Sequence, residues 1–219
     1  MLGGRSGSGM AAAALFGAAL LAASCSDTEP ATSGTVAANA PVTESQVLGT
    51  VHVCTSCHGF EGRSISPTFP NLAGQQPGYI ETQLKAFRDH KRADPHAQTY
   101  MWGMAGHLSD AMIHGIAEFF SKQKPAVGES GNSAMMAAGE TIFRHGLPKD
   151  KVLPCQSCHG VHAQGMGTIP RLAGQHPEYI EKQLEYFSSN ARQNAIMHHN
   201  ARALSTAQIA AVAAYASAQ

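Results

Sequence analysis

The chain has 219 residues, which leaves room for one large domain or two small ones. Hydrophobic residues make up 43% of the chain but aromatic residues only 6%, so each core would be sparse unless a large apolar cofactor completed it. Lysine plus arginine and aspartate plus glutamate balance at 15 each, which leaves no net charge for attracting nucleic acid or an anionic membrane surface.

Residues 1–25 are typical of an export leader. Arg5 precedes the short apolar run MAAAALFGAALLAA, which is followed by small residues and Cys25. This run is too short for a membrane span and has the form of a signal peptide. LAASC also resembles a bacterial lipobox, although Ala22 stands where leucine is preferred. We favour lipidation of Cys25 over ordinary cleavage, because a lone exposed cysteine in an exported protein otherwise needs another use.

Beyond the leader the chain repeats itself at a spacing of roughly 100 residues. Three segments recur in the same order: CTSCHG at 54–59 and CQSCHG at 155–160, FPNLAGQQPGYIETQLKAF at 69–87 and IPRLAGQHPEYIEKQLEYF at 169–187, MWGMAGHLS at 101–109 and MHHNARALS at 197–205. Two tandem domains are the simplest explanation. We therefore expect a leader at 1–25, a disordered tether at 26–43, a first domain at 44–124, a linker at 125–132 and a second domain at 133–219.

Both copies are predicted to be helical, without strands. Thr43 and Gln46 form a capping box at the start of the first copy. The first helix of the second copy is expected to start at Ser133 and to stop near Gly146. Middle helices are expected after Pro77 and Pro177, with apolar stripes at Ile80, Leu84 and Phe87 and at Ile180, Leu184 and Phe187. The last helices are expected to start at Ser109 and Ser205. The predicted fold class is all-α, as a pair of small helical domains.

The motif Cys-x-x-Cys-His occurs once in each copy, and it is the attachment signature of c-type haem. The motifs comprise Cys54, Cys57 and His58 in the first copy and Cys155, Cys158 and His159 in the second. Two cysteines at this spacing can reach the two vinyl groups on one porphyrin edge, and the next residue places a histidine nitrogen under the iron. A disulfide would leave each histidine unexplained, and a zinc site would need its cysteine pairs much closer in sequence. The chain is therefore predicted to hold two covalent haems, attached outside the cytoplasm.

The sixth iron ligand has several candidates. In the first copy they are Met101, Met104, His107, His96 and His90, and in the second they are Met197, His198, His199 and, less plausibly, Met166. When the two copies are aligned on their Leu-Ser pairs, Met101 coincides with Met197, whereas Met104 coincides with an asparagine. This comparison favours the two aligned methionines. Ligation of the second iron by two histidines, with His198 or His199 as the second one, stays an alternative.

The ring N–H of each proximal histidine that does not face the iron is expected to donate a hydrogen bond to a backbone carbonyl, which fixes the orientation of the ring. Pro70 and Pro170 lie a short distance after the two histidines. Since proline offers a carbonyl and has no backbone donor, it suits this task.

Taken together, the haem motif, the duplicated LAGQ...Y...QL segment and the Met-x6-Leu-Ser segment resemble the dihaem cytochrome c4 family of class I cytochromes. The resemblance covers roughly residues 44–219. It implies two cytochrome c domains related by pseudo-twofold symmetry, with haem propionates near their interface. It also implies proximal ligands His58 and His159, distal ligands Met101 and Met197, and carbonyl acceptors Pro70 and Pro170. The insertion GLPKDKVLP before Cys155 and the shorter loop before Met197 depart from an even repeat.

The resemblance implies a periplasmic electron carrier rather than an enzyme, because two irons with His/Met ligands leave no open site for substrate. Its partners would be a membrane quinol-oxidising complex as donor and a terminal oxidase or reductase as acceptor, docked transiently and in a salt-sensitive manner. The protein itself would contact the membrane only through a lipid anchor at Cys25. The alternatives are the haem-bearing subunit of a periplasmic dehydrogenase and, less favoured, a dihaem peroxidase.

Overall fold

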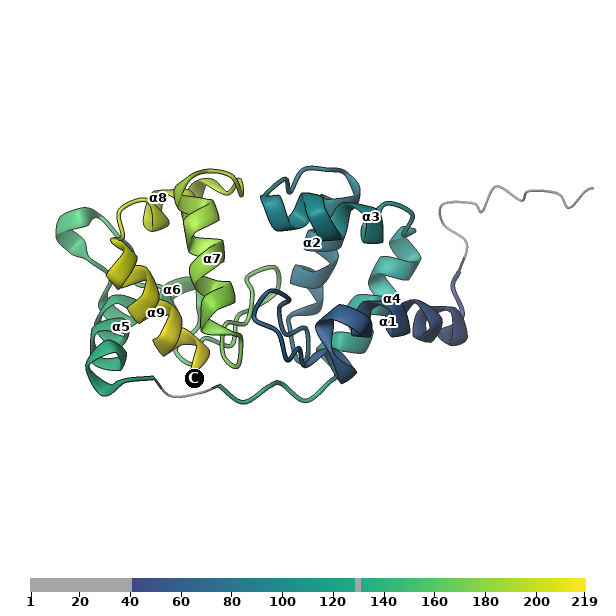
Figure 1. Cartoon of the computed structure of the whole chain (residues 1–219), viewed down its shortest axis with the longest axis horizontal. Coiled ribbons are helices and arrows are strands. Elements are labelled where there is room, and N and C mark those ends of the chain that lie inside the picture. The colour runs from purple at the N-terminus through teal and green to yellow at the C-terminus, as the bar shows by residue number, and fades with distance from the viewer. Residues whose placement is uncertain (1–40, 129–130) are drawn as a thin grey trace, which may run out of the picture. The chain divides into compact units, whose positions relative to one another are not determined.

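The computed structural model of the chain describes residues 41–128 and 131–219, here called the first half and the second half. The expected leader, nearly all of the expected tether and part of the expected linker lie outside these ranges. The described residues belong to one compact unit of the chain (Figure 1). Within them no helix is long and apolar enough to cross a membrane.

Helices and loops make up the first half. Helix α1 carries the haem motif at its C-terminal end, and α2 begins at Pro77. Their bounds, with those of the remaining elements, are α1 Glu44–His58, η1 Phe60–Gly62, α2 Pro77–Arg88, the π-helical turn η2 Ala97–Met101, α3 Trp102–Ala105 and α4 Asp110–Ser121.

The second half repeats this order with one change. Its first helix ends at His145, where Gly146 has a φ of +65°, and its haem motif lies on a separate short helix after the GLPKDKVLP insertion. The elements are α5 Ser133–His145, η3 Pro148–Asp150, α6 Gln156–His159, α7 Pro177–Ser188, α8 Ala195–Ala201 and α9 Thr206–Ser217. Only two isolated β-bridges occur among the described residues. The predicted all-α fold class is confirmed.

Helix starts follow the capping side chains in the sequence. Thr43 and Gln46 form the predicted capping box, and Ser205 forms a second one with the side chain of the third helical residue. The side chain of Ser109 accepts a hydrogen bond from the backbone N–H of Met112 and so caps the start of α4. In the second half the side chain of Asn132, one residue before the expected start, accepts the N–H groups of the first turn of α5.

A separate hydrophobic core fills each half. In the first, the predicted stripe of α2 is buried in a core to which α4 and α3 contribute, with Ile80 at 5% exposure. In the second, the middle residue of the stripe, Leu184, is only partly buried. Much of that core is made by the alanine-rich α9, which packs against α5 (Figure 1). Small side chains let these two helices approach closely, so the core is lean in volume, as the composition predicts.

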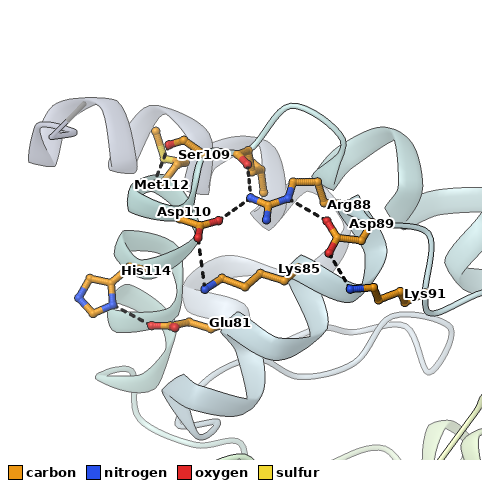
Figure 2. Close-up of polar contacts among 10 residues, drawn as sticks. Glu81, Lys85, Arg88, Asp89, Lys91, Ser109, Asp110, Met112 and His114 are labelled. Atoms are coloured by element: carbon orange, nitrogen blue, oxygen red, sulfur yellow. Dashed lines mark hydrogen bonds and ion pairs between the residues drawn. The ribbon is translucent and has the colours of Figure 1, made fainter. Parts of the chain in front are cut away.

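Surface charges also link α2 to α4 in the first half (Figure 2). Arg88 lies 2.7 Å from Asp110 and donates to the carbonyl of Leu108, while His114 lies 2.7 Å from Glu81. These pairs are largely solvent-exposed, so each contributes little to stability. The apolar stripe beneath them therefore supplies most of the attraction between the two helices.

Because α5 packs closely on α9, adding a side chain at Gly139 should destabilise the protein. A Cβ there would collide with the carbonyl oxygen of Ala211, whereas a Cβ at Gly49, within α1, would meet nothing within 4 Å. Gly139→Ala should destabilise the protein by about 1–3 kcal/mol through overpacking. The matched change Gly49→Ala should stabilise it by about 0.5–1 kcal/mol. Thermal unfolding followed by circular dichroism measures both, and equal effects of the two changes would contradict this packing.

Candidate functional site

The haem motif of the first half lies on one side of the last turn of α1. Cys54 is half-buried and Cys57 exposed, and both are free thiols. Burial raises the pKa of the Cys54 thiol, and its Sγ atom lies 3.3 Å from the carbonyl oxygen of Thr50. Residues three apart on a helix share a face, so both sulfurs are on the side that carries His58.

The ring of His58 is fixed by one hydrogen bond. It is buried, at 7% exposure, and its Nδ1 atom lies 2.9 Å from the carbonyl oxygen of Pro70. A carbonyl can only accept, so Nδ1 carries the hydrogen and Nε2 is left with a free lone pair. Burial lowers the pKa of His58, against the opposing effect of this hydrogen bond. The ring is therefore held in the neutral form and tautomer that bind iron.

An equivalent arrangement occurs in the second half, although its motif follows the insertion. His159 is equally buried, and its Nδ1 atom lies 3.0 Å from the carbonyl oxygen of Pro170. Burial lowers the pKa of His159 and raises the pKa of Cys155 to about 11. The side chain of Gln156 donates to the carbonyl of Arg144, which ties α6 back to the end of α5.

The two methionines chosen by alignment lie at one cavity with the motifs. Met101 ends the π-helical turn η2 and packs against the first core, and Met197 lies in α8. The cavity has a volume of about 690 Å³, and its lining includes the cysteines and histidines of both motifs and both methionines. π-Helical turns are rare and are often found at functional sites. The structure therefore brings together, in each half, two thiols, a neutral imidazole and a thioether.

The competing ligands are placed differently. His198 Nδ1 lies 2.7 Å from the carbonyl oxygen of Phe187, and His199 Nε2 lies 3.1 Å from that of Lys151. Neither is among the described residues that line the cavity. Trp102, which aligns with His198, likewise donates its ring N–H to a backbone carbonyl, at 2.8 Å. The two matched side chains therefore share a structural role, which favours Met197 as the second distal ligand.

Of the other first-half candidates, two reach the cavity. Met104 lines it but is 58% exposed, while His107 is exposed and lies elsewhere. His96 lines the cavity with a buried Nδ1 atom that has no hydrogen-bond partner among the described residues. His90 stacks on the Trp102 ring, with 4.1 Å between the ring centroids. Of these three histidines, only His96 lines the cavity.

The two halves bond to each other through the repeated LAGQ segments. The backbone N–H of Asn71 donates to Gln175 Oε1 at 2.8 Å, and that of Arg171 donates to Gln75 Oε1 at 2.7 Å. The side-chain N–H groups donate in return: Gln75 donates to the carbonyl oxygen of Arg171, and Gln175 donates to the carbonyl oxygen of Asn71. The reciprocal pairing is what a pseudo-twofold axis requires, because each contact occurs twice with the halves exchanged.

A second reciprocal contact buries two arginines. Gln83 Oε1 accepts from Arg92 at 2.8 Å and from Arg192 at 2.7 Å, and Gln183 Oε1 accepts from the same two guanidinium groups at 2.8 and 2.7 Å. Both arginines are buried, at 8% and 7% exposure, and both line the cavity. Two amide oxygens therefore hold two like charges together at the junction of the halves.

Aromatic groups complete the environment of each guanidinium. Arg92 lies over the Phe87 ring at 4.7 Å and Arg192 over the Phe187 ring at 4.6 Å. Arg192 also donates to the hydroxyl of Tyr79 at 2.9 Å. Burial alone would raise the pKa of Tyr79, but Arg192 and then Arg92 lower it overall. The two guanidinium groups thus favour the ionised form of the Tyr79 hydroxyl.

These junction residues were not predicted as part of the site. Tyr79 and Gln83 lie at the border of the apolar stripe of α2, and their polar groups gave no reason to expect them in a buried contact. A usable signal was present, since Tyr79, Gln83 and Arg92 each recur in the second copy at the same spacing, as Tyr179, Gln183 and Arg192. Polar residues that recur in a repeat can mark the surface that the two copies share.

The residues present fit a covalent haem in each half. Paired thiols at the cavity rim, a neutral histidine with a free Nε2 atom and a methionine supply the attachment and ligand chemistry of a c-type haem. The cavity wall is mostly apolar, as a porphyrin requires, and the residues of the junction are among its polar lining.

Comparison with known proteins gives concordant matches. A sequence model described as Cytochrome c matches residues 46–124 and again residues 136–217. The thiosulfate dehydrogenase electron acceptor of Thiomonas intermedia is 48% identical over 177 residues, which is 76% of this chain and 78% of that protein. Cytochrome c-552 of Acidithiobacillus ferridurans is 43% identical over 166 residues, covering 75% and 72%. The solved structure of Acidithiobacillus ferrooxidans cytochrome c4 matches with a TM-score of 0.72 at 42% identity, covering 76% of this chain and 98% of that one.

Ligation by methionine predicts the outcome of two substitutions. Met101→Ala and Met197→Ala should each abolish the far-red ferric band of one haem and lower the reduction potential of that haem, because thioether ligation favours ferrous iron. Optical redox titration measures both effects.

Two matched variants serve as controls for that titration. Met104→Leu, at an exposed position, and His198→Gln should leave both far-red bands in place. Retention of both bands in Met197→Ala, with loss of one in His198→Gln, would contradict the assignment at the second iron.

Proposed function

Because the chain belongs to the dihaem cytochrome c4 family of c-type cytochromes, with two tandem cytochrome c domains that hold covalent haem c, we propose that it carries electrons between membrane-bound respiratory complexes outside the cytoplasm. The family resemblance drawn from the repeated motifs is thereby confirmed. The protein is an electron carrier rather than an enzyme.

One observation carries the proposal: each half places a carbonyl-held histidine and a methionine at a cavity that continues from one half to the other. Each bound haem supplies a one-electron couple, so the protein can hold two electrons. In each half the histidine and the methionine would hold the haem iron, and an iron held by both would have no free position for a substrate.

A quinol-oxidising membrane complex is the proposed donor, and a terminal oxidase or reductase is the proposed acceptor. Acidic and basic side chains balance in the whole chain, so no net charge draws the protein into a permanent complex. We infer weak docking that weakens further as salt screens the partner charges.

A second candidate donor is a thiosulfate dehydrogenase. The relative from Thiomonas intermedia, at 48% identity, is named as the electron acceptor of that enzyme. An acceptor of this kind performs the same one-electron chemistry with a different partner, so the haem sites alone do not separate the two donors.

Rapid mixing separates the two donors. The oxidised holo-protein should be reduced by membranes that carry a quinol-oxidising complex with quinol, and the rate should fall as ionic strength rises. The comparison sample contains a thiosulfate dehydrogenase with thiosulfate in place of the membranes. Fast reduction in the comparison sample and none by the membranes would reject the first donor and select the second.

We also propose that the chain is exported and anchored through a lipid on Cys25, with residues 26–43 as the tether. This rests on the leader, the lipobox-like LAASC and the site of covalent haem attachment. Mass spectrometry of the mature protein should find Cys25 at the N-terminus with the added mass of a diacylglycerol group. An unmodified N-terminus at or after Cys25 would refute the anchor while leaving export intact.

A further inference from the structure

We propose that Asp94 makes the two haem sites electrostatically unequal, so that the site in the first half accepts an electron less readily than the site in the second. Asp94 neutralises the buried Arg92 within its own half, and the second half has no carboxylate at the matching position. The inference rests on the proposed function only in requiring that both haems are bound and undergo reduction.

In the first half the carboxylate has two partners. Asp94 is fully buried, at 0% exposure, and one of its oxygens lies 2.8 Å from Arg92 Nε. The other oxygen accepts the backbone N–H of Ala97 at 3.2 Å, at the start of the turn that ends on Met101. The negative charge is therefore fixed on the segment that supplies the distal ligand.

In the second half an asparagine takes over only one of these contacts. Asn194 accepts the backbone N–H of Met197 at 2.9 Å and so caps α8, as Asp94 caps its own turn. The buried Arg192 is bonded to the amide oxygens and to Tyr79, but it forms no ion pair with any described carboxylate. Its positive charge is thus left uncompensated by acidic side chains.

Charge placement decides the direction of the effect. A fixed negative charge opposes the arrival of an electron, and an uncompensated positive charge favours it. Burial strengthens both effects, because water and salt screen charges much less in the interior than at the surface. Arg92 stays charged beside Asp94, since the two tyrosines and this carboxylate raise its pKa against the effect of burial. The guanidinium group that the first half contributes to the junction thus has a carboxylate partner, and the one that the second half contributes has none.

The second half provides the design of the test. Asp94→Asn removes the charge but keeps a side chain that can cap the turn, as Asn194 does at the matching position. Asp89→Asn is the matched control, because it removes the same charge from the same half at an exposed position (Figure 2). Asn194→Asp is the reciprocal change, and aspartate caps a helix as well as asparagine does.

Spectroelectrochemical titration of the holo-proteins, after confirming two haems per chain, gives the potentials. The methyl NMR signals of the two ligand methionines, assigned with Met101→Ala and Met197→Ala, show which potential belongs to which half. In Asp94→Asn the reduced-to-oxidised ratio of the first haem at a fixed applied potential should rise roughly 3- to 10-fold, and the gap between the two haems should narrow. Asp89→Asn should change this ratio much less.

Two results would overturn the inference. One is an Asp94→Asn protein with two haems and unchanged potentials, and the other is a shift of equal size in Asp89→Asn. If Asp94→Asn fails to fold, Asn194→Asp decides, because it should lower the potential of the second haem, and an unchanged potential there refutes the inference. Failure of the parent protein to bind or reduce two haems would instead count against the proposed function.

Discussion

The hydrogen bond from a buried histidine to a proline carbonyl fixes the chemistry of each half. It sets the tautomer of His58 and of His159 and directs Nε2 into the cavity, while burial lowers the pKa of each ring against the opposing effect of this hydrogen bond. The surrounding structure serves this arrangement. The turn that ends each haem motif presents the ring, the loop before α2 or α7 supplies the carbonyl, and the next helical turns bring a methionine to the same cavity.

The junction of the halves imposes a second constraint. Burying two guanidinium groups side by side is costly, and it is made possible by amide oxygens that each accept from both groups, by aromatic rings beneath them and by Asp94. A network of this kind tolerates little rearrangement, because any broken bond leaves a buried polar group unpaired. The junction therefore holds the histidine and methionine of one half in a fixed relation to those of the other.

Much of this could be predicted from the sequence, where the cause was local. Capping residues and prolines marked the helix starts, the spacing of the haem motif fixed the attachment chemistry, and Pro70 followed from the need for a carbonyl. Alignment of the two copies selected Met101 and Met197. The junction could not be predicted in the same way. Arg92 and Gln83 are polar residues, and they become buried only because the two copies dock on each other. The asymmetry at Asp94 and Asn194 gained meaning only once the burial of the neighbouring arginines was known.

The central claim is that both irons have one histidine and one methionine as ligands. Near-infrared magnetic circular dichroism of the oxidised holo-protein tests it most directly, because the charge-transfer band lies at different wavelengths for His/Met and bis-histidine haem. The account predicts that both haems give the His/Met band, with an intensity that corresponds to two haems per chain. A bis-histidine band from either haem would contradict it.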